Sequence, residues 1–383
     1  MTGSTGIPFN IAHLTGNEET YLSESLASRQ LTGDGPFTAR ASQLLAELVG
    51  GGRCMLTTSC THALEMSALL LDLSDGDEVI MPSFTFVSTA NAFVLRGAIP
   101  VFVDCRPDTL NIDERLIEGA VTERTKAIVV VHYGGVACEM DVILEVARRH
   151  GLAVIEDNAH GLGGSYHGRP LGSFGAMATQ SFHATKNIQC GEGGALVIND
   201  PAYVDRAEII REKGTNRSQF FRGMVDKYRW VDLGSSYLPS DLLAAVLTAQ
   251  LEAFDDIQDR RQKVWAHYDH ALAGWAEQRR VRTPTVDADR QHPAHLYHLL
   301  MPSTADQGGL LKHLADADIL GTFHYVPLDS SPYGKERCRT GPGGCPVTAD
   351  VSGRLVRLPL YADLTEAECA RVADAVSSYE VRE

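Results

Sequence analysis

The chain has 383 residues, of which 44% are apolar and 22% charged, and its formal net charge is −15. The length exceeds the usual size of one compact core, and the composition excludes a disordered or fibrous chain. The negative charge argues against a general nucleic-acid binder, because such proteins neutralise phosphates with clustered Lys and Arg. The apolar stretches are too short to cross a bilayer and the amino terminus has no apolar signal core, so we expect a cytoplasmic protein without a membrane segment.

Short β-branched runs alternate with helical patterns in the first half of the chain. The runs typical of buried strands are 78–81, 99–104, 126–132, 153–156, 178–182 and 195–198. Apolar residues at three- and four-residue spacing predict helices at 61–71, 87–96, 113–120, 141–150 and 203–213. This alternation predicts an α/β domain with a mostly parallel sheet, whose ligands bind beyond the carboxyl ends of the strands.

The pattern changes at residue 241. A long amphipathic helix is expected from 241 to about 275, followed by a mixed segment ending in RLVRLPLY and a last helix near 365–379. We therefore expect a large domain, 1–250, and a smaller one, 251–383. The eight cysteines lack metal-binding spacing, so we predict reduced thiols and no metal site; the CRTGPGGC pair could be a clip or a chance pair.

The segment SFHATKN directly follows a predicted strand and precedes the glycine-rich CGEGGAL. A lysine held at a strand end can lose water, acquire a lower pKa and attack an aldehyde as a nucleophile. Lys186 is the candidate for this role. Taken alone, the segment fits a surface lysine in a turn equally well.

A second segment, AVIEDNAHG, ends an apolar strand in a carboxylate at the edge where such sheets bind ligands. Pyridoxal 5′-phosphate (PLP) needs a carboxylate that keeps its pyridine nitrogen protonated, so that the ring can accept electrons. Asp157 is the candidate, one strand before Lys186. The alternative is a capping or turn aspartate.

The segment TTSCTHALEMSALL brings hydroxyls to the start of a predicted helix, where free amides and the helix dipole favour a phosphate. We expect Cys60 and Thr61 to lie there, together with Ser181 from the lysine segment. In PSFTFVSTANA, an aromatic ring at a strand end could stack on the pyridine face, and Phe86 is preferred to Phe84. The alternatives are an ordinary helix cap and core packing.

Basic residues cluster locally in this acidic chain. Residues 205–229 contain five Arg and two Lys against four acids. The forked donors of Arg suit a diphosphate or a dicarboxylic amino donor. A solvated helix and loop of mixed charge is the alternative.

In chain order, CTHALE, GDEVIMPSFTFVSTANA, EDNAHG, SFHATKN, GEGGAL, EKGTNRSQFF and GSSYLPSDLLAAV resemble the nucleotide-sugar aminotransferase family of fold-type-I PLP enzymes. The similarity is closest to the TDP-4-oxo-6-deoxyglucose 4-aminotransferases, through VSTANAFVLRGA, RPDTLNIDE, VHYGGVACEMD and FHYVPL. The resemblance implies a seven-stranded, largely parallel sheet flanked by helices, a smaller C-terminal α+β domain, and a homodimer with shared active sites.

The resemblance also implies roles for individual residues. Lys186 would bind the cofactor covalently, Asp157 would pair with the pyridine nitrogen and Phe86 would stack on the ring. Cys60, Thr61 and Ser181 would hold the phosphate, with Ser236 of a second copy standing where the family has Asn. His160 replaces a common Gln beside the phenolic oxygen, and an imidazole could donate the same bond. His324 and Tyr325 would lie near the sugar nucleotide, and Arg217 near an anionic group.

The expected reaction is transfer of an amino group from L-glutamate to C4 of a nucleotide-linked 4-keto-6-deoxyhexose, in deoxyamino sugar biosynthesis. A sister activity, PLP-dependent sugar dehydration, uses His in place of the lysine, which Lys186 disfavours. A PLP or sugar-nucleotide-binding regulator without turnover is a further alternative. A nicotinamide-dependent oxidoreductase is disfavoured, because GLGG at 161–164 continues into a loop and does not open a helix.

Overall fold

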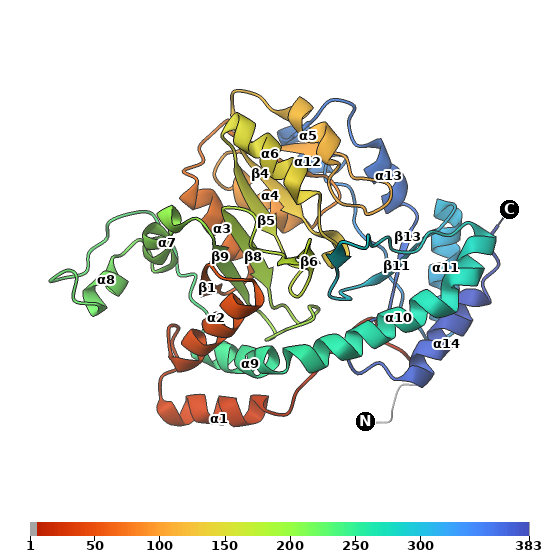
Figure 1. Ribbon diagram of the computed structural model, residues 1–383, viewed down its shortest axis with the longest axis horizontal. Helices are drawn as coiled ribbons and strands as arrows, with labels where there is room; N and C mark the ends of the chain where they lie inside the picture. Colours follow the sequence, from red (N-terminus) through yellow and green to blue (C-terminus); the bar gives the residue numbers. More distant parts are fainter. Residues whose placement is uncertain (1–5, 383) are drawn as a thin grey trace.

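The computed structural model describes residues 6–382. A mixed eight-stranded sheet, in the order β1-β9-β8-β5-β4-β2-β3-β12, forms the centre of the large lobe (Figure 1). Its strands are β1 (Arg53–Thr57), β2 (Glu78–Pro82), β3 (Ile99–Val103), β4 (Thr125–Val131), β5 (Ala153–Asp157), β8 (Met177–Ser181), β9 (Gly194–Ile198) and β12 (Arg339–Thr340). β9 is antiparallel to both of its neighbours and the other pairs are parallel. The largely parallel α/β sheet is thus confirmed, with the short β12 added to the seven expected strands.

Helices cover both faces of this sheet, which explains its apolar strands. The helices of the large lobe are α1 (Glu18–Ser28), α2 (Pro36–Leu48), α3 (Cys60–Leu70), α4 (Val87–Val94), α5 (Glu114–Ala120), α6 (Met140–His150), α7 (Val204–Arg211), α8 (Arg217–Phe221) and α9 (Asp241–Glu252), with 3₁₀ turns at Tyr133–Gly135 and Pro201–Tyr203. Of these, α8 projects away from the sheet (Figure 1). Neighbouring β2 residues alternate between two cores: Val79 packs with α3 and α4, whereas Ile80 packs with α5 and α6. The helices on the two faces leave the carboxyl ends of the parallel strands at one common edge of the sheet.

The C-terminal part has its own core around a two-stranded antiparallel sheet. It contains α10 (Phe254–Arg279), β11 (Tyr297–Leu300), α11 (Thr304–Asp316), α12 (Pro332–Arg337), α13 (Pro346–Ser352), β13 (Leu355–Leu358) and α14 (Glu366–Ser377). A three-stranded sheet of β6 (Ser165–Tyr166), β7 (Arg169–Pro170) and β10 (Arg290–Gln291) links the two parts. This separate core supports the predicted division near residue 250, which stays a prediction.

One helix prediction was wrong. The single long helix expected from 241 to about 275 is two helices, α9 and α10, separated at Ala253, where ψ is 15°. Alanine favours helices, so nothing in the local composition marks this break. The packing explains it, because α9 is buried against α2 and α1 in the large lobe, whereas α10 crosses to the C-terminal core (Figure 1).

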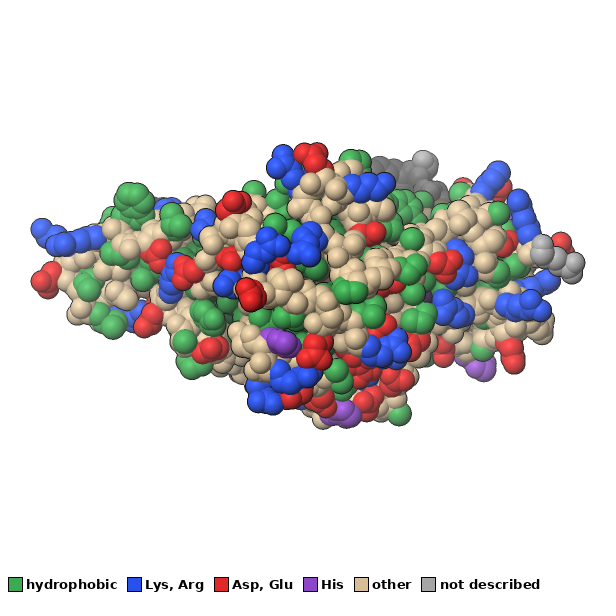
Figure 2. Space-filling model, turned by 90° about the horizontal axis from the view of Figure 1, so that it is seen from above, with side chains coloured by type: hydrophobic (Ala, Val, Ile, Leu, Met, Phe, Trp, Pro, Cys, Tyr) green, Lys and Arg blue, Asp and Glu red, His purple; other side chains and the backbone are tan. Residues whose placement is uncertain are grey.

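A projecting segment around α8 leaves the large lobe on one side (Figure 1). It exposes large apolar side chains beside basic ones, and Figure 2 shows green and blue groups mixed at this end. The exposed apolar residues are Phe220, Phe221, Met224, Tyr228, Trp230, Val231 and Leu233. We call residues 213–235 the arm. Large exposed apolar side chains that gather in one segment are typical of a protein contact.

Two expectations about the whole chain can be compared with the described residues. All eight cysteines are free thiols, so Cys338 and Cys345 form no clip. Within residues 6–382, no helix is long and apolar enough to cross a membrane, and no group of His, Cys, Asp and Glu side chains could hold a metal ion.

Candidate active site

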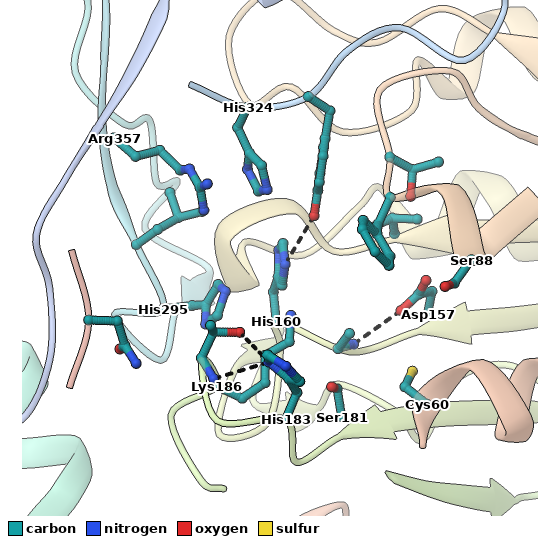
Figure 3. A pocket seen from close by; sticks show the side chains of 18 of the residues that line it. Cys60, Ser88, Asp157, His160, Ser181, His183, Lys186, His295, His324 and Arg357 are labelled. Atoms are coloured by element: carbon teal, nitrogen blue, oxygen red, sulfur yellow. Dashed lines mark hydrogen bonds between the residues drawn. The ribbon is translucent and has the colours of Figure 1, made fainter. Parts of the chain in front are cut away.

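A cavity of about 650 Å³ lies at the carboxyl ends of β5 and β8, between the large lobe and the C-terminal part (Figure 3). Most of the predicted site residues line it: Cys60, Thr61, Phe86, Asp157, His160, Ser181, Lys186, His324 and Tyr325. These residues come from five separate segments of the chain. The rule that parallel sheets bind ligands beyond their strand ends therefore located the cavity correctly.

Lys186 lies in the turn after β8. Its backbone N–H donates to His183 at 2.8 Å, and the flanking Ala184 N–H donates to Gly191 at 2.9 Å, so the loop is folded back on itself. The amine is surrounded by protein atoms within the cavity. This burial lowers the pKa of Lys186 to about 8, although Cys60 and Asp157 act in the opposite direction. A substantial fraction of the amine is therefore an unprotonated nucleophile near neutral pH.

Asp157 ends β5 and its side chain is 5% exposed. Its Oδ2 accepts a hydrogen bond from Thr89 Oγ1 at 2.7 Å, and its Oδ1 accepts one from the Ala159 N–H at 3.2 Å. Within residues 6–382 it forms no ion pair. Burial raises the pKa of Asp157, while the bond from Thr89 opposes this. A buried carboxylate without a cation is suited to a cationic group of a ligand.

Glu156 precedes Asp157 in β5. Because successive side chains of a strand point to opposite faces of the sheet, the two carboxylates lie on different sides. Glu156 is fully buried on the opposite face, 3.0 Å from His132 Nε2, and accepts backbone N–H bonds from Gly172, Phe174 and Gly175. Both oxygens of this carboxylate therefore accept hydrogen bonds from the loop that follows β5. Asp157, and not Glu156, is left for chemistry.

The amino terminus of α3 forms one wall of the cavity. Ser59 caps the helix by accepting the His62 N–H at 3.1 Å, and Thr61 Oγ1 donates to Ser88 at 2.8 Å. The first amides of a helix have no partner within it. A Cβ at Gly194 would lie 2.3 Å from the Cys60 nitrogen, so only glycine lets β9 pass this close. The result is a compact anion cradle of amides and hydroxyls.

The two phenylalanines of β2–α4 have different environments. Phe84 is 1% exposed and packs against Tyr133, with ring centroids 5.1 Å apart, so it is a core residue. Phe86 is 57% exposed and lines the cavity at the start of α4. Only Phe86 presents a free ring face to a ligand.

His160 is a neutral donor. Its Nδ1 accepts the Gly134 N–H at 3.3 Å, so a neutral ring carries its proton on Nε2, which lies 3.3 Å from Tyr325 Oη. Burial, followed by the charges of Lys186 and Arg357, holds the pKa of His160 well below its usual value. An N–H donor therefore stands in the cavity across the physiological pH range.

A family comparison identifies this arrangement. The model of the DegT/DnrJ/EryC1/StrS aminotransferase family matches residues 13–377. The chain belongs to this family.

Relatives support the same conclusion. The aminotransferase is 33% identical over 377 residues to the spore coat polysaccharide biosynthesis protein SpsC of Bacillus subtilis strain 168, covering 97% of this chain and 96% of that one. DesV of S. venezuelae, solved in complex with a ketimine intermediate, is 29% identical with a TM-score of 0.89, covering 98% of both chains. Spr1654 of Streptococcus pneumoniae, solved in PLP form, is 25% identical with a TM-score of 0.88, covering 97% of this chain and 98% of that one.

The sugar aminotransferase uses PLP, and the cavity residues fit this cofactor. Asp157 is a buried carboxylate without a cation, as a protonated pyridine requires. The α3 amino terminus is a cradle for phosphate, and Lys186 is a partly neutral amine for the aldehyde. The three features line one cavity (Figure 3).

Two predicted residues of the aminotransferase lie away from its own cavity. Arg217 is on α8 in the arm, where its Nη1 is 2.7 Å from Glu212 Oε1. Ser236 is exposed and pairs with Glu212 in an isolated β-bridge. The single chain does not bring either residue to Lys186, so their predicted roles require a second copy.

Among the cavity residues of the aminotransferase that were missed from the sequence are Asn10, His295 and Arg357. His295 stacks on His160 with ring centroids 4.1 Å apart, and its Nδ1 lies 2.9 Å from Asn187 Oδ1. The only local signal was the histidine-rich HPAHLYH and the arginine in RLVRLPLY. Neither pattern reveals that the C-terminal part folds over the strand ends.

Proposed function

We propose that this aminotransferase moves an amino group from L-glutamate to C4 of a TDP-linked 4-keto-6-deoxyhexose, giving a 4-amino-4,6-dideoxy sugar nucleotide. The observation that carries the proposal is the shared cavity of Lys186 and Asp157, with a pKa of about 8 for the lysine. The sequence resemblance to TDP-4-oxo-6-deoxyglucose 4-aminotransferases supports the substrate. A cytoplasmic location remains part of the proposal.

When bound, PLP supplies the electron sink that makes the substrate's carbon–hydrogen bond acidic. Asp157 keeps the pyridine nitrogen protonated, and Thr89 orients this carboxylate through its 2.7 Å bond. Lys186 first binds the cofactor and then, displaced by the incoming amine, carries a proton away from the substrate carbon as a general base. One amine thus serves as anchor and as base.

The other residues position the reactants. Cys60, Thr61 and Ser181 hold the phosphate at the α3 amino terminus, and Phe86 covers one ring face. Burial raises the pKa of the Cys60 thiol, so it contacts phosphate as a neutral group. His160 donates its Nε2–H toward the cofactor's phenolic oxygen, the bond expected of the Gln it replaces.

His324 and Tyr325 are proposed to face the sugar nucleotide. His324 Nδ1 lies 3.1 Å from Tyr133 Oη, which fixes the ring, and burial holds the pKa of His324 well below its usual value. Burial also raises the pKa of Tyr325 well above its usual value, so its hydroxyl keeps its proton. Neutral polar groups of this kind suit sugar hydroxyls.

The proposed enzyme is a homodimer in which the arm reaches the second copy. The exposed apolar residues of the arm, such as Phe221 and Trp230, support this contact, and Arg217 and Ser236 lie on or beside it. In a dimer each arm would deliver Arg217 to an anionic group, and Ser236 to the phosphate, of the neighbouring cavity. Sedimentation velocity should give twice the chain mass, and a monomer would contradict the proposal.

Mass spectrometry of products tests the reaction itself. The holoenzyme is incubated with L-glutamate and a panel of keto-sugar nucleotides that differ in nucleotide and keto position. Amine transfer to C4 of the TDP-linked 4-keto-6-deoxyhexose is the expected result. Transfer only to another sugar, or loss of water without amine transfer, would overturn it.

Mixing two inactive variants tests the shared site. Lys186→Ala and Arg217→Ala homodimers are combined and allowed to exchange subunits. Each mixed dimer has one cavity with both native residues, so activity should recover to about a quarter of the wild-type level. No recovery, despite mixed dimers in native mass spectrometry, would place Arg217 outside the neighbouring cavity.

A further inference from the structure

Arg357 is a cation in the cavity that no carboxylate among residues 6–382 neutralises. It lies on β13 and lines the cavity together with His295 and His324. Figure 3 shows these three on one side of the cavity and Cys60, Ser181 and Asp157 on the other. Arg357 forms no ion pair within residues 6–382. Burial lowers the pKa of Arg357, and the phenols of Tyr133 and Tyr325 oppose this.

The guanidinium is held along one edge. Its Nε and Nη2 both donate to the carbonyl oxygen of Phe323, at 3.3 and 3.1 Å, and its Cζ lies 4.8 Å above the ring of Phe9. The backbone is fixed as well, because β13 pairs with β11 and Arg357 bridges Thr322. The remaining edge, formed by Nη1 and Nη2, has two parallel N–H groups, which match the two oxygens of a carboxylate.

The surroundings favour an anion at that edge. The acidic side chains that line the cavity are Asp157, on the opposite side, and Glu192, which is 3.6 Å from His183. His160, His295 and His324 are neutral, because burial holds the pKa of each well below its usual value and the charge of Arg357 adds to this effect. This side of the cavity therefore carries uncompensated positive charge, which costs free energy until an anion arrives.

We infer that Arg357 is the specificity residue for the amino-acid donor, binding one of its carboxylates through the Nη1–Nη2 edge. The inference rests on the proposed function, since it requires that an amino acid enter this cavity. The donor's nitrogen must reach the cofactor beside Lys186, and Arg357 stands on the substrate side of that lysine, away from the phosphate cradle. The keto-sugar ring carries no charge, and the diphosphate of its nucleotide is the competing anion that the half-reaction measurement distinguishes.

Arg357→Gln and Arg357→Lys variants test the inference, and Arg260→Gln is a matched control because Arg260 is an exposed residue of α10. The first measurement is calorimetric binding of glutarate, a dicarboxylate that cannot react. Arg357→Gln should weaken binding about 10- to 100-fold, as expected for loss of a charge-assisted pair. Arg357→Lys should fall between it and wild type, since the charge remains without the fork.

The second measurement separates the half-reactions by stopped-flow absorbance. Arg357→Gln should slow the reaction with L-glutamate about 10- to 100-fold and leave the reaction of the aminated enzyme with keto sugar within about twofold. An equal effect on both, an effect on the sugar step alone, or no effect on either would overturn the inference. If wild type itself does not react with L-glutamate, the proposed donor fails, and glutarate binding still tests Arg357.

Discussion

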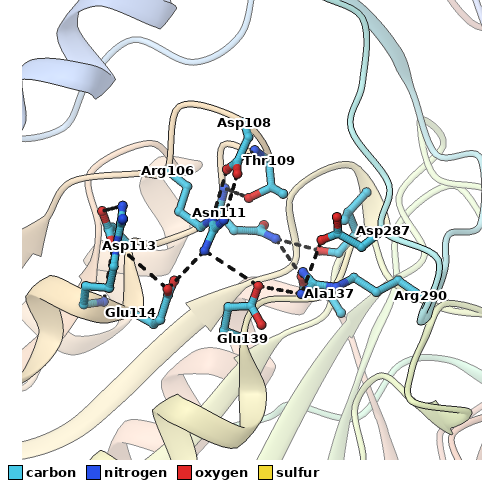
Figure 4. Close-up of polar contacts among 12 residues, drawn as sticks. Arg106, Asp108, Thr109, Asn111, Asp113, Glu114, Ala137, Glu139, Asp287 and Arg290 are labelled. Carbon is cyan, nitrogen blue, oxygen red and sulfur yellow. Dashed lines mark hydrogen bonds and ion pairs between the residues drawn. The ribbon is translucent and has the colours of Figure 1, made fainter.

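The ion-pair network around β3 and α6 and the cavity both contain several charged side chains, but they differ in how far those side chains are paired with one another. Around β3 and α6, Arg290 Nη2 lies 2.5 Å from Glu139 Oε1, and Arg106 contacts Asp108 and Glu114 at 2.7 and 3.0 Å (Figure 4). In the cavity, neither Lys186 nor Asp157 has an opposite charge within ion-pair distance among the described residues. In the first region the charged side chains pair with one another. In the cavity Lys186 and Asp157 are left unpaired and can bind charged groups of a ligand.

The pKa shifts follow the same division. In the network, the hydrogen bond from Arg106 lowers the pKa of Asp108 to about 2, so that the carboxylate stays charged. In the cavity, burial lowers the pKa of Lys186 to about 8 and raises that of Asp157. Charge is stabilised where it holds the fold, and it is destabilised where a cofactor is to be bound.

Replacing the cavity lysine should have the largest effect. Lys186→Ala removes both the anchor and the base, so turnover should fall by at least about 10⁴-fold and the visible absorbance of the lysine-bound cofactor should disappear. Thermal stability should be retained or slightly higher, because a desolvated amine is lost. Steady-state kinetics and absorbance spectra measure this, and turnover with intact absorbance would contradict the role.

Asp157→Asn preserves the side-chain shape but removes the charge. Because the pyridine nitrogen then loses the group that keeps it protonated, turnover should fall about 10²-fold or more while the protein stays folded. Circular dichroism and half-reaction kinetics test both parts. A variant that unfolds at a much lower temperature but keeps normal turnover per folded molecule would contradict the prediction, because Asp157 would then stabilise the fold without taking part in the reaction.

Arg290→Gln should show the opposite behaviour. The Arg290 side chain is 4% exposed and its Nη1 also donates to Ala137 at 2.6 Å, so its loss leaves Glu139 without its main partner. We expect about 2–3 kcal/mol lower free energy of unfolding, discounted because Glu139 is partly exposed. Urea unfolding measures this against Arg260→Gln, which should change little. Loss of turnover in the folded variant would contradict the prediction that Arg290 stabilises the fold and takes no part in the reaction.

The smallest effect concerns pH. Since reaction with the cofactor's aldehyde needs the neutral amine, the rate of PLP uptake by the apoenzyme should rise about tenfold per pH unit below about 8 and level off above it. Because the folded pKa of Lys186 is below its usual value of 10.5, this residue makes the apoenzyme more stable as pH rises from about 8 to 10.5. The rate is measured by stopped-flow absorbance. A rate that levels off only near pH 10 would contradict the prediction, because it would show that the pKa of Lys186 is that of a solvent-exposed lysine.

The sequence predicted the strands and the residues that follow them better than the contacts between distant segments. Lys186 and Asp157 were found because each lies at the end of an apolar strand, where local pattern and sheet geometry agree. β1 was missed because its five residues, RCMLT, are too mixed to read as a buried strand. Arg357 was missed because only tertiary packing brings β13 to the cavity, more than 150 residues after Lys186 in the chain.

Lys186 is proposed to hold PLP, on the evidence that it lines the same cavity as Asp157. Borohydride reduction of the holoenzyme, followed by peptide mass spectrometry, tests it directly by making the cofactor's attachment permanent. The pyridoxyl mass should be found on the peptide containing Lys186. Label on another lysine, such as Lys213, would contradict this account.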